Sequence, residues 1–298
     1  MGMNSVLLIG AENLAERLEA YKRLLPAESI AILKPEGAEE GRNTFLGVPV
    51  AHEWPDASGG IADIAGDCAA RAVTARRALE SGCRALIHPP FGDSYANAEA
   101  ILAAAGGAMR VALPVHYTHK YESAAQSARA GIGDTITVRN IRVFPPAQAW
   151  QQSLFQLVES LILLGGPLQR IYARAAALKS SDTDTVFCNG RYVNSAIFYG
   201  EMSAAYPSNY SKEVIEITGR EGMVEYDSNA RSFWMASESG IALAEAYHRT
   251  PYEKMADAYL RSWEAEAESA LGLPDPLPAL RAYWAAMESI ERNEVVAI

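Results

Sequence analysis

His88 ends a short segment that has the composition of a buried strand, and two prolines, Pro89 and Pro90, follow it. The surrounding segment 79–93, LESGCRALIHPPFGD, predicts the end of a helix, a turn, the strand and then a stop. Open α/β sheets bind ligands at the carboxyl ends of their strands, where a histidine can donate a proton near neutral pH. His88 is therefore a candidate catalytic acid. The alternative is a histidine that a local hydrogen bond satisfies in a stiff Pro-Pro turn.

A second group of proton donors lies in the segment 115–122, VHYTHKYE, where the chain passes from the first to the second predicted domain. His116, Tyr117, His119 and Lys120 lie almost next to one another in a chain that has only 5 histidines. His116 and His119 have no third ligand at a recognisable spacing, so we expect no metal site. Tyr117 and His119 are candidate acids near a cleft between the domains, and polar residues that begin a helix are the alternative.

One acid, Glu159, lies in the otherwise apolar helix predicted over 147–166. It is either a carboxylate that faces a pocket or the solvated edge of an amphipathic stripe. The apolar flanks favour the pocket, so Glu159 joins the candidate catalytic residues.

The first third of the chain alternates short apolar runs with helical patterns, which indicates a doubly wound α/β domain with a parallel sheet. Helix-closing glycines at Gly82 and Gly106 support this pattern. We place a Rossmann-like dinucleotide-binding domain at 1–114.

Longer strands follow, with hairpin turns such as Gly219 to Gly222, and they indicate a large, mostly antiparallel open sheet covered by helices. This α+β part, at 115–274, is the expected substrate and oligomerisation domain. The Pro-rich segment 273–278 would allow the final helix, about 275–298, to pack back on the first domain.

The composition excludes some classes of binding partner. A net charge of −10 and a pI near 5.1 argue against nucleic acid and anionic membrane surfaces, so a small-molecule ligand is expected. The 3 cysteines share no metal-type spacing, and the N-terminal MGMNSVLLIG has no basic leader. No apolar run approaches the ~18 residues of a membrane span. We expect a cytoplasmic protein.

With this order of elements, the chain resembles the Gfo/Idh/MocA oxidoreductases. The hairpin IEITGREGMVEYD at 215–227 is similar to the family's "i.i.Gt.G.l..d" element, and AMESIERNEVVAI at 286–298 to its "A..ES...g..V.l" ending. LILLGGPLQRIYA at 161–173 looks like "wllG.p..v.a". The resemblance implies NAD(P)-dependent hydride transfer on a small carbonyl, imine or polyol compound.

The family's dinucleotide fingerprint, G-x-G-x-x-G/A, is only partly present. Gly10 stands at the first place and Ala15 suits the third, but Glu12 replaces the second glycine, where the pyrophosphate approaches the backbone. Glu12 and Asn13 are also typical of helix capping and first-turn positions, which is the interpretation we favour. The resemblance makes Gly10, Glu12 and Asn13 candidate cofactor-binding residues.

The acid that usually binds the adenosine ribose is absent after the second strand, which ends at Lys34. Lys34 and Arg42 could contact a 2′-phosphate, so NADP is slightly favoured over NAD.

The family's Glu-Lys-Pro turn is also changed. Aligned without a gap, Pro89 replaces the lysine; with the strand one residue shorter, His88 takes the lysine position and Pro89 the proline position, beside the nicotinamide. The family's H-x-x-D motif is missing as well, since Phe155 or Gln156 stands at the histidine position and Glu159 is the nearest acid.

The Tyr-x-His sequence at Tyr117 and His119 looks like that of the thiazolinyl imine reductases, a branch of the same superfamily. His88, Tyr117 and His119 could then form a substitute set of acids. Two hypotheses stay open: a divergent oxidoreductase, or a catalytically inactive relative that acts as a ligand-binding or partner subunit.

The open sheet also predicts assembly. Its outer face has many large apolar residues along or near it, which favours a homodimer or homotetramer formed through this face. These residues are Ile197, Phe198, Tyr199, Tyr206, Phe233 and Trp234, although strand alternation alone would bury half of them.

Overall fold

A computed structural model describes most of the chain, and its residues form two compact units. The described residues are 5–33, 44–51, 54, 59–144, 149–206, 211–229, 232–237, 240–244, 251–264 and 273–298. The first unit comprises Met1–Pro114 and Arg249–Asp275, and the second comprises Val115–His248 and Pro276–Ile298.

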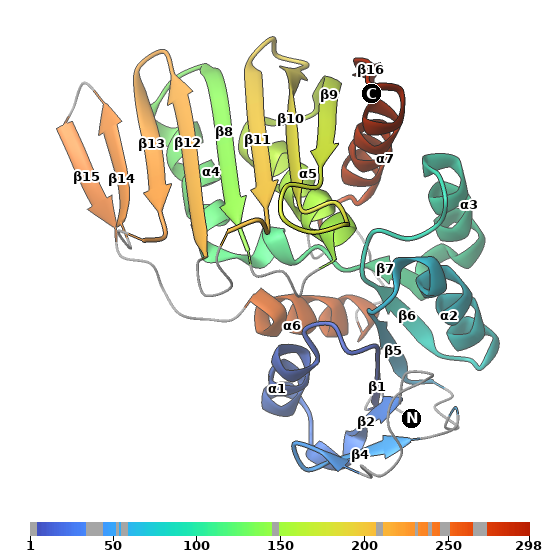
Figure 1. Ribbon diagram of the computed structural model, residues 1–298. Helices are drawn as coiled ribbons and strands as arrows, with labels where there is room; N and C mark the ends of the chain where they lie inside the picture. Colours follow the sequence, from blue (N-terminus) through green and yellow to red (C-terminus); the bar gives the residue numbers. More distant parts are fainter. Residues whose placement is uncertain are drawn as a thin grey trace. The chain divides into compact units, whose positions relative to one another are not determined.

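The first unit is a sheet of short parallel strands with helices between them, as the alternating periods predicted (Figure 1). The strands lie in the order β3-β4-β2-β1-β5-β6-β7, and only the β3–β4 pair is antiparallel. The strands are β1 Val6–Ile9, β2 Ile30–Leu33, β3 Thr44–Phe45, β4 Val48–Ala51, β5 Ile61–Ile64, β6 Arg84–Ile87 and β7 Met109–Val111. The helices are α1 Leu14–Leu24, α2 Cys68–Glu80, α3 Tyr95–Ala105 and α6 Pro251–Glu264, with 3₁₀ turns at Ala27–Ser29 and Gly106–Ala108.

Local capping explains where two helices of this unit, α2 and α3, begin. Asp67 accepts a hydrogen bond from the backbone N–H of Ala69 at the start of α2, and Ser94 accepts one from Asn97 at the start of α3. Because β1 and β5 are neighbours and parallel, their carboxyl ends meet at one edge of the sheet. The turn after β1 and the turn after β5 therefore lie together.

The second unit is a large open sheet with helices on one face (Figure 1). Its strand order is β15-β14-β13-β12-β8-β11-β10-β9-β16, antiparallel except between β8 and β11. The strands are β8 Thr135–Val143, β9 Leu168–Ala176, β10 Thr185–Tyr192, β11 Ile197–Ser203, β12 Lys212–Gly219, β13 Gly222–Asp227, β14 Ser232–Ser237, β15 Gly240–Ala244 and β16 Val296–Ala297. The helices are α4 His119–Gly131, α5 Trp150–Gly165 and α7 Leu277–Arg292, and the 3₁₀ turn Pro114–Tyr117 precedes α4.

The fold class expected from the sequence is confirmed: an α/β Rossmann-like part and an α+β part with a mostly antiparallel sheet. The hairpin predicted at Gly219 to Gly222 joins β12 and β13. The expected alternation of the open sheet also holds, but it places Phe198 and Phe233 on the buried face, at 3% and 7% exposed. Ile197 and Tyr206 are exposed.

The two C-terminal helices are assigned differently from the sequence prediction. The sequence would allow the final helix to pack back on the first domain; in the structure α7 packs on β9 and α5 of the second unit. Its buried Tyr283 meets Phe155, and the Ser289 hydroxyl accepts a hydrogen bond from the backbone of Ala173 at 2.8 Å.

Instead, α6 belongs to the first unit and packs on α1 (Figure 1, α6 in orange and α1 in dark blue). The Tyr259 hydroxyl donates to the carbonyl of Val111 at the end of β7, at 2.5 Å. Both helices are amphipathic, so their pattern alone does not tell which sheet each one covers.

Candidate functional site

His88 follows β6 as predicted, but its side chain lies in the core of the first unit. It is 1% exposed, and its Nε2 lies 2.8 Å from Oδ1 of Asp63 on the neighbouring strand β5. Asp63 also forms an ion pair of 2.9 Å with Arg17 of α1, which is equally buried. The ring is thus bound within the fold, by the distant Asp63 and not by the local hydrogen bond that the alternative for His88 expected, and it presents no acid to a ligand in this arrangement.

The charges of this buried group follow from its contacts. Burial alone would raise the pKa of Asp63, but Arg17 and His88 outweigh it and hold that pKa well below its usual value. Burial lowers the pKa of His88, and Asp63 opposes the shift only in part. The group is therefore an ionised aspartate between a guanidinium and a neutral imidazole.

The turn after His88 is buried too, and the peptide bond Pro89–Pro90 is cis. The carbonyl oxygens of His88 and Pro90 each accept a hydrogen bond of 3.1 Å from Nη1 of Arg71. Pro89 lies between these two contacts, in a turn that Arg71 of α2 holds in place.

The turn after β1 keeps one feature of the dinucleotide fingerprint. Gly10 has φ +86, and a Cβ at this position would lie 1.8 Å from the carbonyl oxygen of Ala65. Only glycine permits this close approach of the two turns. The first glycine of the pattern is therefore required by the backbone itself.

Glu12 does not cap α1, contrary to our interpretation. Its carboxylate lies 2.5 Å from Nη2 of Arg71 and 3.4 Å from the backbone N–H of Gly66, in the turn after β5. Asn13, at the N-cap position with φ 47, also makes no side-chain cap; its amide instead donates to the Tyr252 hydroxyl of α6 at 2.7 Å. Long-range partners outcompete local capping for both side chains.

These residues fit an anion, because the turn already holds one, the carboxylate of Glu12. Arg17 fixes the backbone around it by donating to the carbonyl groups of Ile9, Gly10 and Glu12 at 3.2, 3.3 and 3.1 Å. A pyrophosphate bound here would compete with Glu12 for Arg71. Lys34 and Arg42, the residues predicted to contact a 2′-phosphate, lie outside the described residues.

In the second unit, His116 and Glu159 form a pair that the sequence did not predict. Nδ1 of His116, in the 3₁₀ turn before α4, lies 3.0 Å from Oε1 of Glu159 on α5. The Glu159 side chain is fully buried, whereas that of His116 is 23% exposed. The imidazole therefore connects a buried acid with the surface of the unit.

Burial raises the pKa of Glu159, although the contact with His116 opposes that shift. No described residue bonds its second oxygen, Oε2. Glu159 is thus a buried acid that can hold a proton above its ordinary range, and it is not the solvated edge of an amphipathic stripe. The sequence signal for its partner was the cluster of histidines at 116 and 119.

His119 makes its contact within its own helix. His119 begins α4, and its Nδ1 lies 3.1 Å from the Ser123 hydroxyl one turn later. This contact agrees with the alternative that polar residues start the helix. Tyr117 lies in the 3₁₀ turn beside His116 and is half-buried.

A further polar group surrounds Glu213 of β12 on the helix-covered side of the sheet. Lys120 and Tyr121 of α4 both donate to its carboxylate, and Arg142 of β8 lies 3.4 Å away. Burial would raise the pKa of Glu213, but Lys120 and Arg142 outweigh it and lower that pKa. Arg142 also donates to Gln156 at 3.0 Å, and Gln156 precedes Glu159 by one turn of α5. Glu213 and Arg142 were not predicted as site residues, because in alternating strands they look like ordinary polar positions.

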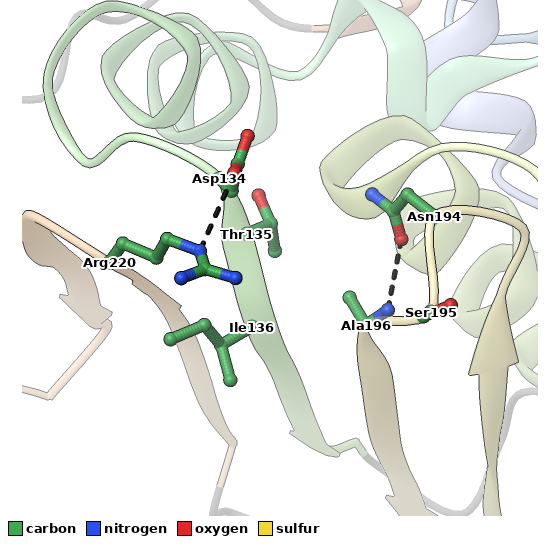
Figure 2. Close-up of a pocket in the computed structure, with 7 residues that line it drawn as sticks. All are labelled: Asp134, Thr135, Ile136, Asn194, Ser195, Ala196 and Arg220. Atoms are coloured by element: carbon green, nitrogen blue, oxygen red, sulfur yellow. Dashed lines mark hydrogen bonds and ion pairs between the residues drawn. The ribbon is translucent and has the colours of Figure 1, made fainter.

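A hollow of about 380 Å³ lies elsewhere in the second unit, at the start of β8 (Figure 2). The turns after β10 and β12 line it, with Asn194, Ser195 and Arg220 among its residues. Arg220 lies 3.4 Å from Asp134, and both side chains are largely exposed. None of the predicted site residues lines this hollow, so the candidate chemistry lies elsewhere.

Among the described residues, no group of three or more histidine, cysteine, aspartate or glutamate side chains could hold a metal ion. No helix in the described part of the chain is long and apolar enough to cross a membrane.

The chain matches no known family model and no curated protein at a significant level. Its fold, however, matches solved structures over nearly the whole chain. One is an oxidoreductase from Agrobacterium radiobacter in complex with NAD⁺, L-tartaric acid and magnesium, with a TM-score of 0.79, 15% identity and coverage of 99% of this chain and 98% of that one. Levoglucosan dehydrogenase in complex with NADH and L-sorbose gives the same values. An NAD binding oxidoreductase from Klebsiella pneumoniae gives a TM-score of 0.76 with 14% identity, over 99% and 98%. The chain therefore shares its fold with these solved oxidoreductase structures, which agrees with the fold that the sequence resemblance implied.

Proposed function

We propose that this chain is an NAD(P)-dependent oxidoreductase in which His116 and Glu159 handle the proton. The observation that carries the proposal is the imidazole–carboxylate contact of 3.0 Å between these residues, in a fold shared with NAD-binding oxidoreductases. The family resemblance implies a histidine and an acid on one helix of the large domain. Here α5 supplies only the acid, and a separate turn supplies the imidazole.

The proposed chemistry is the reduction of a small carbonyl or imine, or the reverse oxidation of a polyol. A bound nicotinamide supplies or accepts the hydride. His116 uses Nδ1 to contact Glu159, so its Nε2 is the atom that gives a proton to the substrate oxygen or nitrogen, or removes one in the reverse direction. Glu159 orients the ring through this contact.

We propose NADP as the preferred cofactor, with NAD as the alternative. The support is the pair of basic residues near the end of the second strand, Lys34 and Arg42, and the lack of an acid at that point. A 2′-phosphate adds charge that such side chains can bind.

The test is a turnover assay with NADPH and NADH against a panel of carbonyls, imines and polyols. In the active combination, His116→Gln should lower kcat by about 10²- to 10⁴-fold, the usual contribution of a positioned proton donor. Gln126→Ala, on an exposed position of α4, is the matched control and should change kcat less than about 3-fold. A His116→Gln enzyme with the kcat of the control would contradict the proposal.

A second candidate function is a catalytically inactive relative that binds a ligand or a partner. The Glu12 carboxylate in the turn after β1 favours it, as does the burial of His88. The discriminating measurement is calorimetric titration with NADPH and NADH. Absence of binding at millimolar cofactor would favour this second function.

We also propose assembly into a homodimer or homotetramer through the outer face of the open sheet. Ile197 and Phe187 lie on neighbouring strands of this face and are 49% and 38% exposed. Light scattering on a size-exclusion column should give a multiple of the 32.2 kDa chain mass. The double variant Phe187→Lys/Ile197→Lys should shift the protein to monomer, because it places charge in an apolar contact.

A further inference from the structure

We propose that Glu12 is a built-in anion that occupies a phosphate-binding position, and that Arg71 is the residue that binds the phosphate of a ligand when Glu12 is displaced. The inference rests on the proposed function, since the ligand class is a diphosphate such as that of a nicotinamide dinucleotide. The inference adds a gate to that site, by which we mean the Glu12 side chain that competes with the ligand for the guanidinium of Arg71.

The geometry of Arg71 is the first support. Its side chain is 1% exposed, and it donates to the carbonyl of Gly66 at 3.1 and 2.7 Å. Together with its contacts to His88 and Pro90, this fixes the guanidinium between the turns after β5 and β6. Neutral carbonyl groups orient a guanidinium without cancelling its charge, so the Glu12 carboxylate at 2.5 Å supplies the neutralising charge.

The backbone beside the carboxylate is the second support. The Gly66 N–H points to Glu12 at 3.4 Å, and Gly10 and Gly66 allow the two turns to touch. A carboxylate that meets an N–H and a guanidinium at the carboxyl ends of β1 and β5 makes the contacts that a phosphate oxygen makes. The position is thus built for an oxyanion, and the chain supplies one from its own sequence.

Burial indicates that the carboxylate covers the site and that it can move. The Glu12 side chain is 15% exposed at the mouth of the turn, whereas Arg71 behind it is closed off. Turning this one side chain outward uncovers the guanidinium without moving a helix or strand. A ligand phosphate must do this against the attraction of the ion pair, so the wild-type chain should bind diphosphates weakly.

The test measures the binding of ADP-ribose by calorimetry, because this probe carries the diphosphate but no nicotinamide. Glu12→Ala should bind ADP-ribose at least about 10-fold more tightly than the wild type, which corresponds to about 1.4 kcal/mol. Glu12→Gln keeps the side-chain shape and removes the charge, and it should show a gain in the same direction. Glu16→Gln, which changes an exposed acid in the first turn of α1, is the charge-matched control, and its affinity for ADP-ribose should stay within about 3-fold of the wild type.

The role of Arg71 is tested by adding Arg71→Gln to the Glu12→Ala variant, which should abolish the gain. The thermal midpoint should likewise rise with ADP-ribose only where binding is tight. If both Glu12 variants bind no more tightly than Glu16→Gln, or if the gain survives Arg71→Gln, the inference is wrong.

The outcomes also separate this inference from the proposed function. A Glu12→Ala variant that binds ADP-ribose tightly but turns over no substrate with NADPH or NADH would contradict the proposed function and leave the gate intact. If the wild-type enzyme turned over substrate and neither Glu12 variant changed the affinity for ADP-ribose, only the inference about Glu12 would be wrong.

Discussion

The two units each contain a histidine bonded to a carboxylate, and the two pairs differ in burial and in neighbouring charge. In the first unit, His88 and Asp63 are both sealed in the core, and Arg17 keeps the aspartate ionised. In the second unit, Glu159 is buried with a raised pKa, while His116 is partly exposed. The same two functional groups therefore serve different purposes.

The group bonded to the carboxylate besides the histidine decides what such a pair can do. A buried guanidinium holds Asp63 in its ionised form, and burial lowers the pKa of His88, so that its imidazole stays neutral in the core. Glu159 has no bonded guanidinium of that kind among its described contacts, and burial raises its pKa. The first pair is suited to stability and the second to chemistry.

The largest expected effect comes from removing the guanidinium of the first pair. Arg17→Leu leaves Asp63 as a buried, uncompensated charge and frees three loop carbonyls, which should cost about 3–5 kcal/mol of the free energy of unfolding. Urea denaturation measures this loss. The control is Arg23→Leu on the same helix, whose exposed ion pair with Glu253 should contribute less than about 1 kcal/mol. Equal losses of unfolding free energy in the two variants would contradict the structural role assigned to Arg17.

The next largest effect should separate the two histidines by stability. His88→Ala removes a buried donor to Asp63 and leaves a cavity, so we expect a loss of about 2–3 kcal/mol. His116→Ala should cost only about 1 kcal/mol, because the ring is partly exposed and Glu159 can take up a proton instead. The two unfolding free energies, measured side by side in urea, would contradict the assignment if their order were reversed.

The dependence of stability on pH should also differ between the pairs. The pKa of His88 is lowered in the folded state, so below the unfolded value of about 6.5 the unfolded chain binds a proton that the folded chain does not. Stability should therefore fall as the pH drops below about 6.5, with a slope of at most about 1.4 kcal/mol per pH unit from this group. His88→Gln should remove that part of the slope in unfolding curves collected from pH 7.5 to 5. Asp63, whose pKa is depressed, adds a further loss only below about pH 4.

The smallest effect is expected from the acid of the second pair. The pKa of Glu159 is raised, so its contribution has the opposite sign: stability is lost as the pH rises above the unfolded value of about 4.3. The free energy of unfolding of Glu159→Gln should thus lie within about 1 kcal/mol of the wild-type value. It should increase relative to the wild-type value as the pH rises from 4 to 8. Thermal midpoints across this range measure the difference. If the midpoint of the variant fell relative to that of the wild type as the pH rises, Glu159 would need its charge in the folded state.

Local pattern was enough to predict most of the architecture. The stripe of Leu14, Leu18 and Tyr21 predicts α1, and period-two alternation predicts strands such as β12. The units on which α6 and α7 pack were not predictable in this way, because an amphipathic stripe requires an apolar partner without specifying which one.

The site residues were harder to predict, since their partners lie far away along the chain. Glu12 and Arg71 are 59 positions apart, and His116 and Glu159 are 43 apart. One signal was present in the sequence: Asp63 lies in the middle of the apolar run IADIA, where a carboxylate needs a buried counter-charge. That requirement points to a buried arginine and, through it, to the structural role of His88.

The return of α6 to the first unit has a consequence for how the protein is made. During synthesis the strands and helices up to Pro114 emerge first, but the helix that covers α1 follows only after the whole of the segment Val115–His248. At ~5–20 residues per second this delay lasts roughly 7–30 s. Through that interval the apolar side of α1 stays uncovered on the nascent chain, so the ribosome-bound intermediate should be a substrate for chaperones until α6 has been translated.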